Sequence, residues 1–269
     1  MSDRSRSRRV DVLPLVGLAG ALVLWAVVIA VLVEPGDLLR RFAPADALGS
    51  VGNFFAESRG PTHVVATLRR LAVGLVTALV GGVGLGIAVG MSDRLSRATS
   101  AVFQFLRMVS PLAWTPIAII VLGVGDTPVY FLVAVAAIWP VLLNTVAGIH
   151  ALDPGWIDVG HSLGATRAEI IRTIIAPGIL PHIVTGLRVA LGVAWVVIVP
   201  AEMLGVDSGL GYAILDARDR LAYSELMAII LVIGVIGYVL DRVAVRLTRT
   251  GRPVPPRGSL TPTVVGSVR

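Results

Sequence analysis

Residues 71–91 read LAVGLVTALVGGVGLGIAVGM, a run without a charged side chain and with a small residue at every fourth position. A helix needs roughly 20 mostly apolar residues to cross the hydrocarbon core of a bilayer, and this run is long enough. The small residues are Gly74, Ala78, Gly82, Gly86 and Gly90. In lipid, such a stripe lets two helix backbones approach closely. The run therefore predicts a membrane-spanning helix that is buried against another helix.

The composition of the whole chain agrees with a membrane environment. Of its 269 residues, 55% are hydrophobic and only 15% are charged, whereas soluble domains carry roughly 25% charged residues. These values exclude an ordinary cytosolic enzyme, a disordered protein and a disulfide-stapled secreted scaffold. The chain has no cysteine, which removes thiol nucleophiles and thiolate metal sites.

Six apolar runs are long enough to cross a bilayer, so we expect an all-α, polytopic membrane protein with about six transmembrane helices. The predicted spans are residues 12–33, 64–91, 98–124, 129–149, 183–204 and 226–247. The first run exceeds the usual 7–15-residue apolar region of a cleaved signal peptide, so an uncleaved helix is the better interpretation.

The 23 basic residues are all arginines, and they gather at both ends of the chain and between the apolar runs. Basic residues beside spans favour the cytoplasmic side, so we interpret them as topology signals rather than as a nucleic-acid patch, with both termini in the cytoplasm. The expected organisation is a basic cytoplasmic N-terminus at 1–11, a first transmembrane helix with its outer loop at 12–63, a transmembrane core at 64–248 that contains a cytoplasmic loop at 153–181, and a basic, disordered C-terminal tail at 249–269.

Ionisable side chains inside spans are costly and mark candidate functional positions. Arg107, Arg188 and Glu202 are the candidates for a translocation path. Arg188 lies near a predicted span end and could equally snorkel to the interface, and Glu202 either stabilises packing or faces an outer vestibule. Arg69 and Arg70 lie close enough to a span end that we expect them to snorkel.

Two prolines interrupt the third predicted span. Pro111 and Pro116 each remove a backbone donor and clash with the preceding turn. Broken backbone at membrane depth is tolerated where protein or a water-filled cavity satisfies it. The prolines therefore either shape a helix that lines a pathway or introduce a simple kink, and both interpretations stay open.

Residues 153–181 read DPGWIDVGHSLGATRAEIIRTIIAPGILP, a segment too polar to cross lipid and too long for a simple turn. The pattern predicts two short helices that meet at Gly164. The first begins at Pro154, a residue favoured at helix starts, and Gly164 supplies the turn that ends it. The second places isoleucines on one face and stops at Pro177. The expected product is a helical hairpin at the membrane surface that a soluble partner could grip.

This segment resembles the cytoplasmic loop motif of bacterial ABC importer permeases, written E-A-A-x3-G-x9-I-x-L-P. Aligned on Gly164, nine residues lead to Ile174, and Pro177 takes the place of the proline. The chain departs from the motif at Asp158, Val159 and Gly160, in place of Glu-Ala-Ala, and at Ala176, in place of Leu.

The resemblance extends from about residue 68 to residue 242 and is greatest to the nitrate/sulfonate/taurine branch of these permeases. The stretches that carry it are Ser110–Pro116, Trp139-Pro140 with Asn144-Thr145, Thr185–Arg188, Pro200–Met203 and Gly209–Tyr212.

The resemblance implies a type I ABC importer permease that works as a homodimer. Two copies of a separate ATP-binding subunit would dock beneath it, and an extracytoplasmic substrate-binding protein would deliver a small solute, nitrate or a sulfonate such as taurine. The coupling residues implied are Asp158, Val159, Gly160, His161, Ser162, Leu163 and Gly164, with Ile174 and Pro177 from the second helix.

We expect no catalysis, cofactor or metal in this chain. It contains no lysine and so no G-x-x-x-x-G-K-[ST] phosphate loop. An intramembrane enzyme is disfavoured because none of the four histidines forms an H-x-x-x-H pair. The alternative that remains is a stand-alone secondary transporter or channel, which predicts inverted repeats or paired acids at mid-depth.

Overall fold

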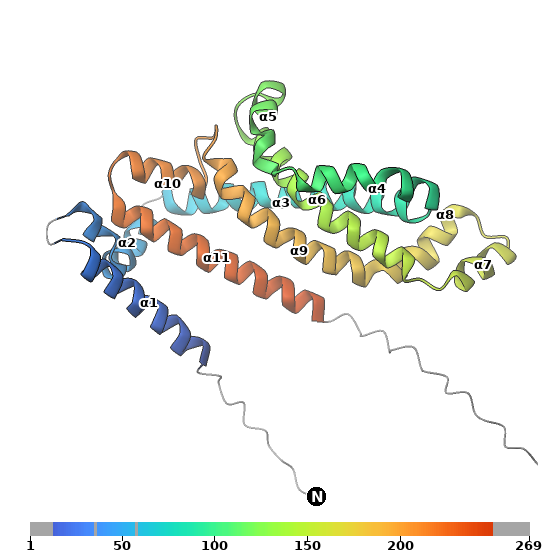
Figure 1. Ribbon diagram of the computed structural model, residues 1–269, viewed down its shortest axis with the longest axis horizontal. Coiled ribbons are helices and arrows are strands. Elements are labelled where there is room, and N and C mark those ends of the chain that lie inside the picture. The colour runs from blue at the N-terminus through green and yellow to red at the C-terminus, as the bar shows by residue number, and fades with distance from the viewer. Residues whose placement is uncertain (1–12, 35–36, 57–58, 250–269) are drawn as a thin grey trace, which may run out of the picture.

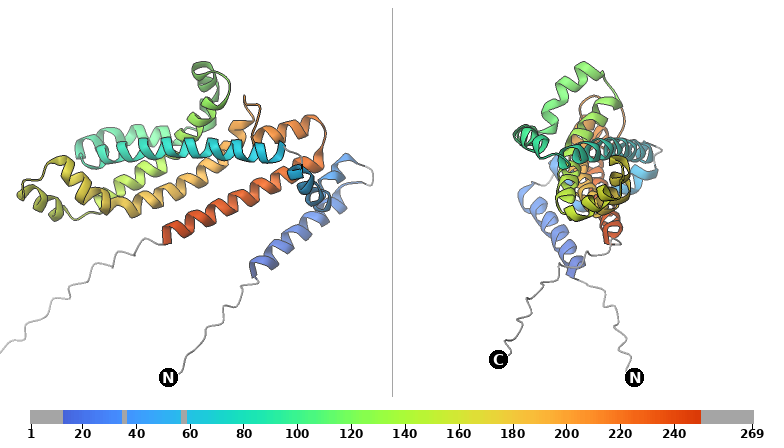
Figure 2. Two further views of the ribbon diagram at one scale, coloured as in Figure 1. Left: turned by 180° about the vertical axis from the view of Figure 1, so that it is seen from behind. Right: turned by 90° about the vertical axis from the view of Figure 1, so that its right-hand side faces the viewer.

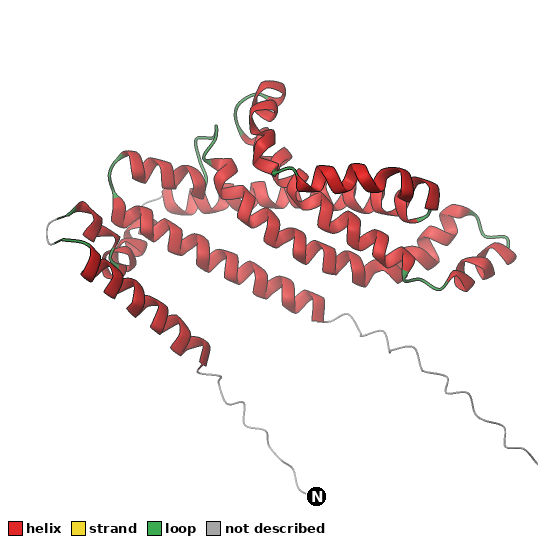
Figure 3. Cartoon of the chain, in the orientation of Figure 1, coloured by secondary structure: helices red, strands yellow, loops and turns green. Residues whose placement is uncertain are grey.

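The computed structural model describes residues 13–34, 37–56 and 59–249, and within them all regular elements are helices (Figure 3). The all-α prediction is confirmed. The predicted N-terminal segment 1–11, and all but the first residue of the predicted tail 249–269, lie outside the described residues.

The helices of the first half are α1 (Leu13–Leu32), α2 (Pro44–Ala56), α3 (Arg59–Gly90), α4 (Asp93–Met108), α5 (Thr115–Leu122) and α6 (Asp126–His150). Those of the second half are α7 (Pro154–Ser162), α8 (Arg167–Ile170), α9 (Ala176–Glu202), α10 (Leu210–Asp219) and α11 (Tyr223–Arg249).

The centre of the molecule is a bundle of α3, α6 and α9, and α11 runs beside α9 (Figure 1). The largest hydrophobic cluster draws its buried residues from these three central helices. Helices α7 and α8 form one end of the elongated molecule, whereas α2 and α10 lie near the other (Figure 2). Helix α5 stands away from the bundle, and α1 diverges from it (Figure 1).

The small-residue stripe of α3 packs directly on α6, as the sequence predicts. A Cβ atom added at Gly82 would lie 2.9 Å from the Val141 side chain, and one added at Gly86 would lie 2.6 Å from the Cβ atom of Thr145. Such separations are shorter than van der Waals contact, so only glycine fits at these two positions. The stripe therefore sets the distance between the two helix axes.

A second stripe, on α9, packs on another face of α6. Gly186, Ala190 and Ala194 are all buried, and a Cβ atom at Gly186 would lie 3.0 Å from the carbonyl oxygen of Pro140. Helix α6 is thus held on both sides by backbones that approach closely, an arrangement that suits association in lipid.

The third predicted span is broken rather than kinked. Helix α4 ends before a 3-10 turn, Pro111–Trp114, and the bend between Asp93–Met108 and Pro111–Leu122 is 88°. The residue before a proline is disfavoured in helical conformation, and Ser110 is extended, with φ −58° and ψ 129°. Pro116 lies in the first turn of α5, where a missing N–H is tolerated.

Four helical stretches are long and apolar enough to cross a membrane: Arg59–Gly90, Asp126–His150, Arg167–Glu202 and Tyr223–Arg246. The bent pair of α4 and Pro111–Leu122 gives a fifth if it counts as one span. The first predicted span coincides with α1, of which Ala19–Leu32 is a shorter apolar helix. The described residues therefore support four or five of the six predicted spans by length and composition.

Replacing Gly86 by alanine tests the packing of α3 on α6. The added methyl group would meet Thr145, and overpacking of this kind costs about 1–3 kcal/mol. We expect Gly86→Ala to lower the thermal unfolding temperature of the purified chain in mild detergent.

Gly84 is the matched control, because it lies on the same helix and a Cβ atom there meets nothing within 4 Å. Alanine is the better helix former by about 1 kcal/mol, so Gly84→Ala should be neutral or stabilising. Equal effects of the two variants would contradict the close contact at Gly86.

Candidate functional site

Of the predicted coupling residues, 158–164 lie in α7 and in the turn that joins it to α8, at one end of the molecule (Figure 1), whereas Ile174 lies in the π-helical turn after α8 and Pro177 in α9. Helix α7 begins at Pro154, where the Asp153 carboxylate accepts a hydrogen bond from the Gly155 N–H at 3.0 Å. It ends at Ser162, just before the turn at Gly164. The predicted start and end of the first helix are therefore confirmed.

The turn at Gly164 is a Schellman motif. The Gly164 N–H donates to the His161 carbonyl, and the Ala165 N–H donates to the Gly160 carbonyl, each at 3.0 Å. Gly164 has φ +74°, and a Cβ atom there would meet nothing within 4 Å. The requirement for glycine is therefore conformational rather than a matter of space.

A capping box starts the second helix immediately after the turn. The Thr166 N–H donates to the Glu169 carboxylate at 2.7 Å, and the Glu169 N–H donates to the Thr166 hydroxyl at 3.3 Å. With a Schellman end and a capped start only a few residues apart, the angle between the two helices is set locally.

Gly160 lies between the two helices of the hairpin. It is buried, and a Cβ atom there would lie 3.1 Å from Ile174 and 3.3 Å from Ile170. Glycine at this position, where the motif has alanine, lets α7 sit close to the second helix. Ile174 therefore packs on the inner side of the hairpin, against Gly160, and is not part of its outer surface.

The second helix does not stop at Pro177, so that prediction is wrong. A π-helical turn, Ile171–Ile175, joins α8 to α9, and Arg167–Glu202 forms one helical stretch of 36 residues. A proline lacks an N–H and its ring clashes with the preceding turn. The π-helical turn shifts the hydrogen-bond ladder just before Pro177, and the helix continues through the proline.

The outer face of α7 is apolar although it is exposed. Trp156, Val159 and Leu163 are 66%, 56% and 81% exposed, and their spacing places them on one side of the helix. Large apolar side chains that share an exposed face mark an interaction surface.

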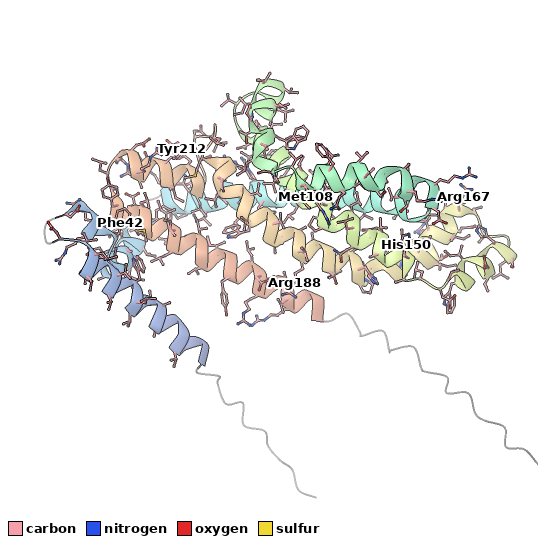
Figure 4. All side chains as sticks on the ribbon, viewed as in Figure 1. Phe42, Met108, His150, Arg167, Arg188 and Tyr212 are labelled. Carbon is pink, nitrogen blue, oxygen red and sulfur yellow. The ribbon has the colours of Figure 1, made fainter. Side chains whose placement is uncertain are left out.

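The five residues expected along a path do not form one group. Arg107, Pro111 and Pro116 lie at or near the corner between α4 and α5. Arg188 lies on α9 facing α11 (Figure 4); its guanidinium is 3.7 Å from the Asp241 carboxylate, and both groups are exposed. Glu202 lies elsewhere, at the end of α9 far from the hairpin.

Glu202 is fully buried and belongs to a charged cluster that the sequence did not reveal. Its carboxylate lies 2.8 Å from Nη1 of Arg70, which is only 1% exposed. It also accepts hydrogen bonds from the Thr67 hydroxyl at 2.9 Å and from the Gly211 N–H at 3.0 Å. Every polar atom of this carboxylate is thus satisfied inside the protein, as a buried charge requires.

Arg70 joins several elements at this end of the bundle. Besides Glu202 it binds Asp126, at the start of α6, at 2.7 Å, and donates to the carbonyl of Ser208 at 2.7 Å. Asp126 also pairs with Arg69, which is exposed. The expectation that Arg70 snorkels is therefore wrong, because three helices and a loop surround its guanidinium.

Two glycines let α10 approach the buried carboxylate. A Cβ atom at Gly209 or Gly211 would collide with Glu202 or with the carbonyl of Val199. The start of α10 therefore rests on Glu202, where the N-terminal end of a helix favours a negative charge.

At the exposed edge near this cluster, Arg220 binds Glu225 and Asp216, each at 2.9 Å. The hydrogen bond that Arg220 donates to the Glu225 carboxylate, and then the bonds it donates to Asp216, raise the pKa of Arg220 above its usual range. Among the residues that the structure describes, no group of three or more His, Asp or Glu side chains could hold a metal ion.

Glu202→Gln tests whether the cluster stabilises the fold. The amide would leave part of the Arg70 charge uncompensated, and breaking a buried pair costs about 3–5 kcal/mol. We expect a large fall in the unfolding temperature of the purified chain, measured in mild detergent.

Asp219→Asn makes the same chemical change in the exposed Arg218–Asp219 pair. Exposed pairs contribute about 0–1 kcal/mol, so this variant should unfold close to wild type. A Glu202→Gln protein as stable as Asp219→Asn would show that the buried cluster adds nothing to stability.

Comparison with known proteins covers most of the chain. Residues 82–250 match the family model described as binding-protein-dependent transport system inner membrane component. A bicarbonate transport system permease protein, CmpB of Synechocystis sp., is 34% identical over 252 residues, covering 88% of each chain.

Two other relatives are named for the transport of other solutes. The nitrate import permease protein NrtB of Synechocystis sp. is 33% identical over 233 residues, covering 85% of each chain. The taurine transport system permease protein TauC of Escherichia coli is 36% identical over 179 residues, covering 66% of this chain and 65% of that protein.

The fold matches a solved ABC transporter. A chain of the inward-facing MetNI methionine ABC transporter superposes with a TM-score of 0.60 at 18% identity, covering 70% of this chain and 93% of that one. The chain belongs to the family of binding-protein-dependent transport system inner membrane components: it is the multi-pass, non-catalytic permease subunit of an ABC importer.

Proposed function

We propose that two copies of this chain form the translocation path of an importer for a small oxyanion of the nitrate, bicarbonate or sulfonate class, with residues 64–248 as the permease core. The observation that carries the proposal is the hairpin of α7 and α8, a locally set structure with an exposed apolar face at one end of the bundle. Support for the substrate class comes from the relatives, which are named for bicarbonate, nitrate and taurine transport.

The hairpin is suited to dock in a groove of a soluble ATPase subunit. Trp156, Val159 and Leu163 offer an apolar contact, and Asp158, His161 and Ser162 surround it with polar groups. An apolar centre with a polar rim is the usual anatomy of a protein interface. Two permease copies would present two hairpins, one for each copy of the ATPase.

ATP binding to the ATPase would then act on the permease because the ATP-bound ATPase dimer would bind one permease conformation better than the other. A partner shifts a conformational equilibrium only as far as it binds one state better than the other. If the ATP-bound and ATP-free ATPase dimers hold the two hairpins at different separations, the permease would alternate between inward- and outward-open forms without chemistry of its own.

The position and composition of helix α5 support the proposal that a second copy of the chain is present. It is apolar, stands away from the bundle (Figure 1) and exposes Ile117, Ile120 and Val121. At about 12 Å in length it is too short to cross the bilayer, so lipid alone does not explain its protrusion. Packing against the partner copy would cover these side chains.

The distribution of charge supports an orientation with the hairpin and both termini in the cytoplasm. Arg94 and Arg97, at the α3–α4 turn, and Arg167 and Arg172, in the hairpin, lie toward one end of the bundle. Arginine-rich connections favour the cytoplasmic side. The opposite end, with α10, would face the substrate-binding protein.

The direct test is purification of the tagged chain from its native membranes in gentle detergent, with partners identified by mass spectrometry. We expect a stoichiometric ATPase and a tethered binding protein, and uptake of labelled nitrate, bicarbonate or taurine by cells that carry the assembled complex. Recovery of the chain alone, even after cross-linking, would contradict the proposed assembly with an ATPase and a binding protein.

Leu163→Asp tests the docking face. A charge in the centre of an apolar interface removes a contact of the kind that contributes 2 kcal/mol or more, roughly a thirtyfold change in affinity. We expect the ATPase to be lost during purification and ATP-driven uptake to fall in proportion, whereas the permease itself remains inserted.

Ala168→Asp adds the same charge to an exposed position of α8, outside this face. It should retain the ATPase. Normal ATPase association of the Leu163→Asp protein would contradict the assignment of the α7 face.

A further inference from the structure

Helix α4 carries a stripe of polar side chains along one face. The stripe consists of Ser96, Thr99, Ser100, Gln104 and Arg107. These positions recur at intervals of three and four residues, so they share one side of the helix, which Phe103 joins. The opposite side carries Leu95, Val102, Phe105 and Met108, which are all exposed. Helix α4 is thus amphipathic although it lies within a predicted span.

The polar stripe lines a groove against α6. The groove has a volume of about 250 Å³ and is closed on the α6 side by Trp139, Leu142, Leu143 and Val146. The rings of Phe103 and Trp139 lie 5.7 Å apart, centre to centre. A water molecule occupies about 30 Å³, so the groove has room for a small anion together with several waters.

Arg107 supplies a positive charge to this groove. Its Nη2 donates to the Gln104 amide oxygen at 2.9 Å. The ion pairs among the described residues use other arginines, at positions 69, 70, 188, 218 and 220. Among the described residues, no carboxylate therefore compensates the charge of Arg107, and Gln104 orients its guanidinium.

The position of Arg107 along the bundle makes a lipid-facing role costly. It follows Asp93, the first residue of α4, by 14 positions, which is about 21 Å of helix. If a hydrocarbon core of about 30 Å begins at Asp93 and α4 runs along the membrane normal, Arg107 lies about two thirds of the way across it. An arginine at that depth faces a protein interior or a water-filled cavity.

The groove faces the side of the molecule on which the second copy would lie. Helices α4 and α5 are on the same side of the α3–α6–α9 bundle (Figures 1 and 2). If α5 packs against the partner, the groove opens toward the space between the two copies.

We infer that the groove between α4 and α6 is an oxyanion-binding section of the translocation path, with Arg107 as its cationic group and Gln104 as a positioning residue. The inference rests on the proposed function. A planar guanidinium binds oxyanions through paired N–H groups. The hydroxyls of Ser96, Thr99 and Ser100 extend a polar surface from Arg107 toward the hairpin end of α4.

The absence of cysteine from the chain allows a direct test. Gln104→Cys places a thiol next to Arg107, and Phe105→Cys places one at the same depth on the apolar side of α4. In membrane vesicles that carry the full chain, each variant is treated with an anionic sulfonatoethyl or a cationic trimethylammonium-ethyl methanethiosulfonate of similar size. The labelling rates are compared with those of a free thiol.

We expect Gln104→Cys to be labelled and Phe105→Cys to be labelled much more slowly. At Gln104→Cys the anionic reagent should be favoured about tenfold, because Arg107 attracts it across a short distance. Adding Arg107→Gln should remove this preference by slowing the anionic reagent and accelerating the cationic one, whereas Arg107→Lys should retain it. A misfolded variant would accelerate both reagents.

Arg97→Gln is the matched charge control, because Arg97 is exposed on the same helix seven residues before position 104. It should leave most of the preference intact. Equal labelling at positions 104 and 105, or a preference that survives Arg107→Gln, would overturn the inference.

Binding is tested by adding millimolar nitrate, bicarbonate or taurine during labelling of Gln104→Cys, with gluconate as the comparison. At least one of the three should slow labelling of Gln104→Cys more than gluconate does. Equal effects of all four would overturn the oxyanion site. The labelling needs neither ATP nor an ATPase, so a chain that purifies without an ATPase but shows charge-selective labelling would contradict the proposed docking of the hairpin and leave the anion path standing.

Discussion

Close contact of helix backbones along α6 is the constraint on which the rest of the structure depends. In lipid, apolar burial gives helices no net drive to associate, so packing and hydrogen bonding must hold them together. Glycines of α3 and the small residues of α9 bring two backbones against α6 from different sides. A rigid three-helix core follows. Outside it, α1, α5 and the outer face of α7 present large apolar side chains that the core does not cover.

The buried charges complement this packing at the end of the bundle opposite the hairpin. Arg70 bonds to Glu202 of α9, to Asp126 at the start of α6 and to the loop before α10, so one guanidinium fixes four segments. Apolar contacts in lipid are undirected, whereas a buried ion pair demands defined geometry and is costly to break. We interpret the cluster as fixing the positions of these helix ends relative to one another.

The sequence predicted those features that depend on local patterns. The length of the apolar runs predicted four or five of the spans. The four-residue repeat of small residues predicted that α3 packs closely on another helix, and Pro154 and Gly164 predicted the limits of the first hairpin helix. Each of these patterns rests on residues close together in the chain. The Arg70–Glu202 pair joins residues 132 positions apart and was missed. Comparing the depth of each charged residue within its span could have found it, since Arg70 and Asp126 lie toward the starts of α3 and α6, Glu202 lies at the end of α9, and these helix ends meet at one end of the bundle. Pro177 failed as a stop because a π-helical turn compensates for it, and such a turn has no simple sequence pattern.

The helix from Arg167 to Glu202 connects the two ends of the molecule without interruption. Its 36 residues extend about 54 Å, from the capped start of the hairpin to the buried carboxylate. Because a helix resists compression, a displacement of the hairpin would be carried along this element toward Glu202. The π-helical turn near its hairpin end is the point where register could change at least cost, since it already departs from the regular ladder. On the proposed function, the same helix would link the ATPase-facing hairpin to the charged cluster that holds α10, at the end facing the binding protein.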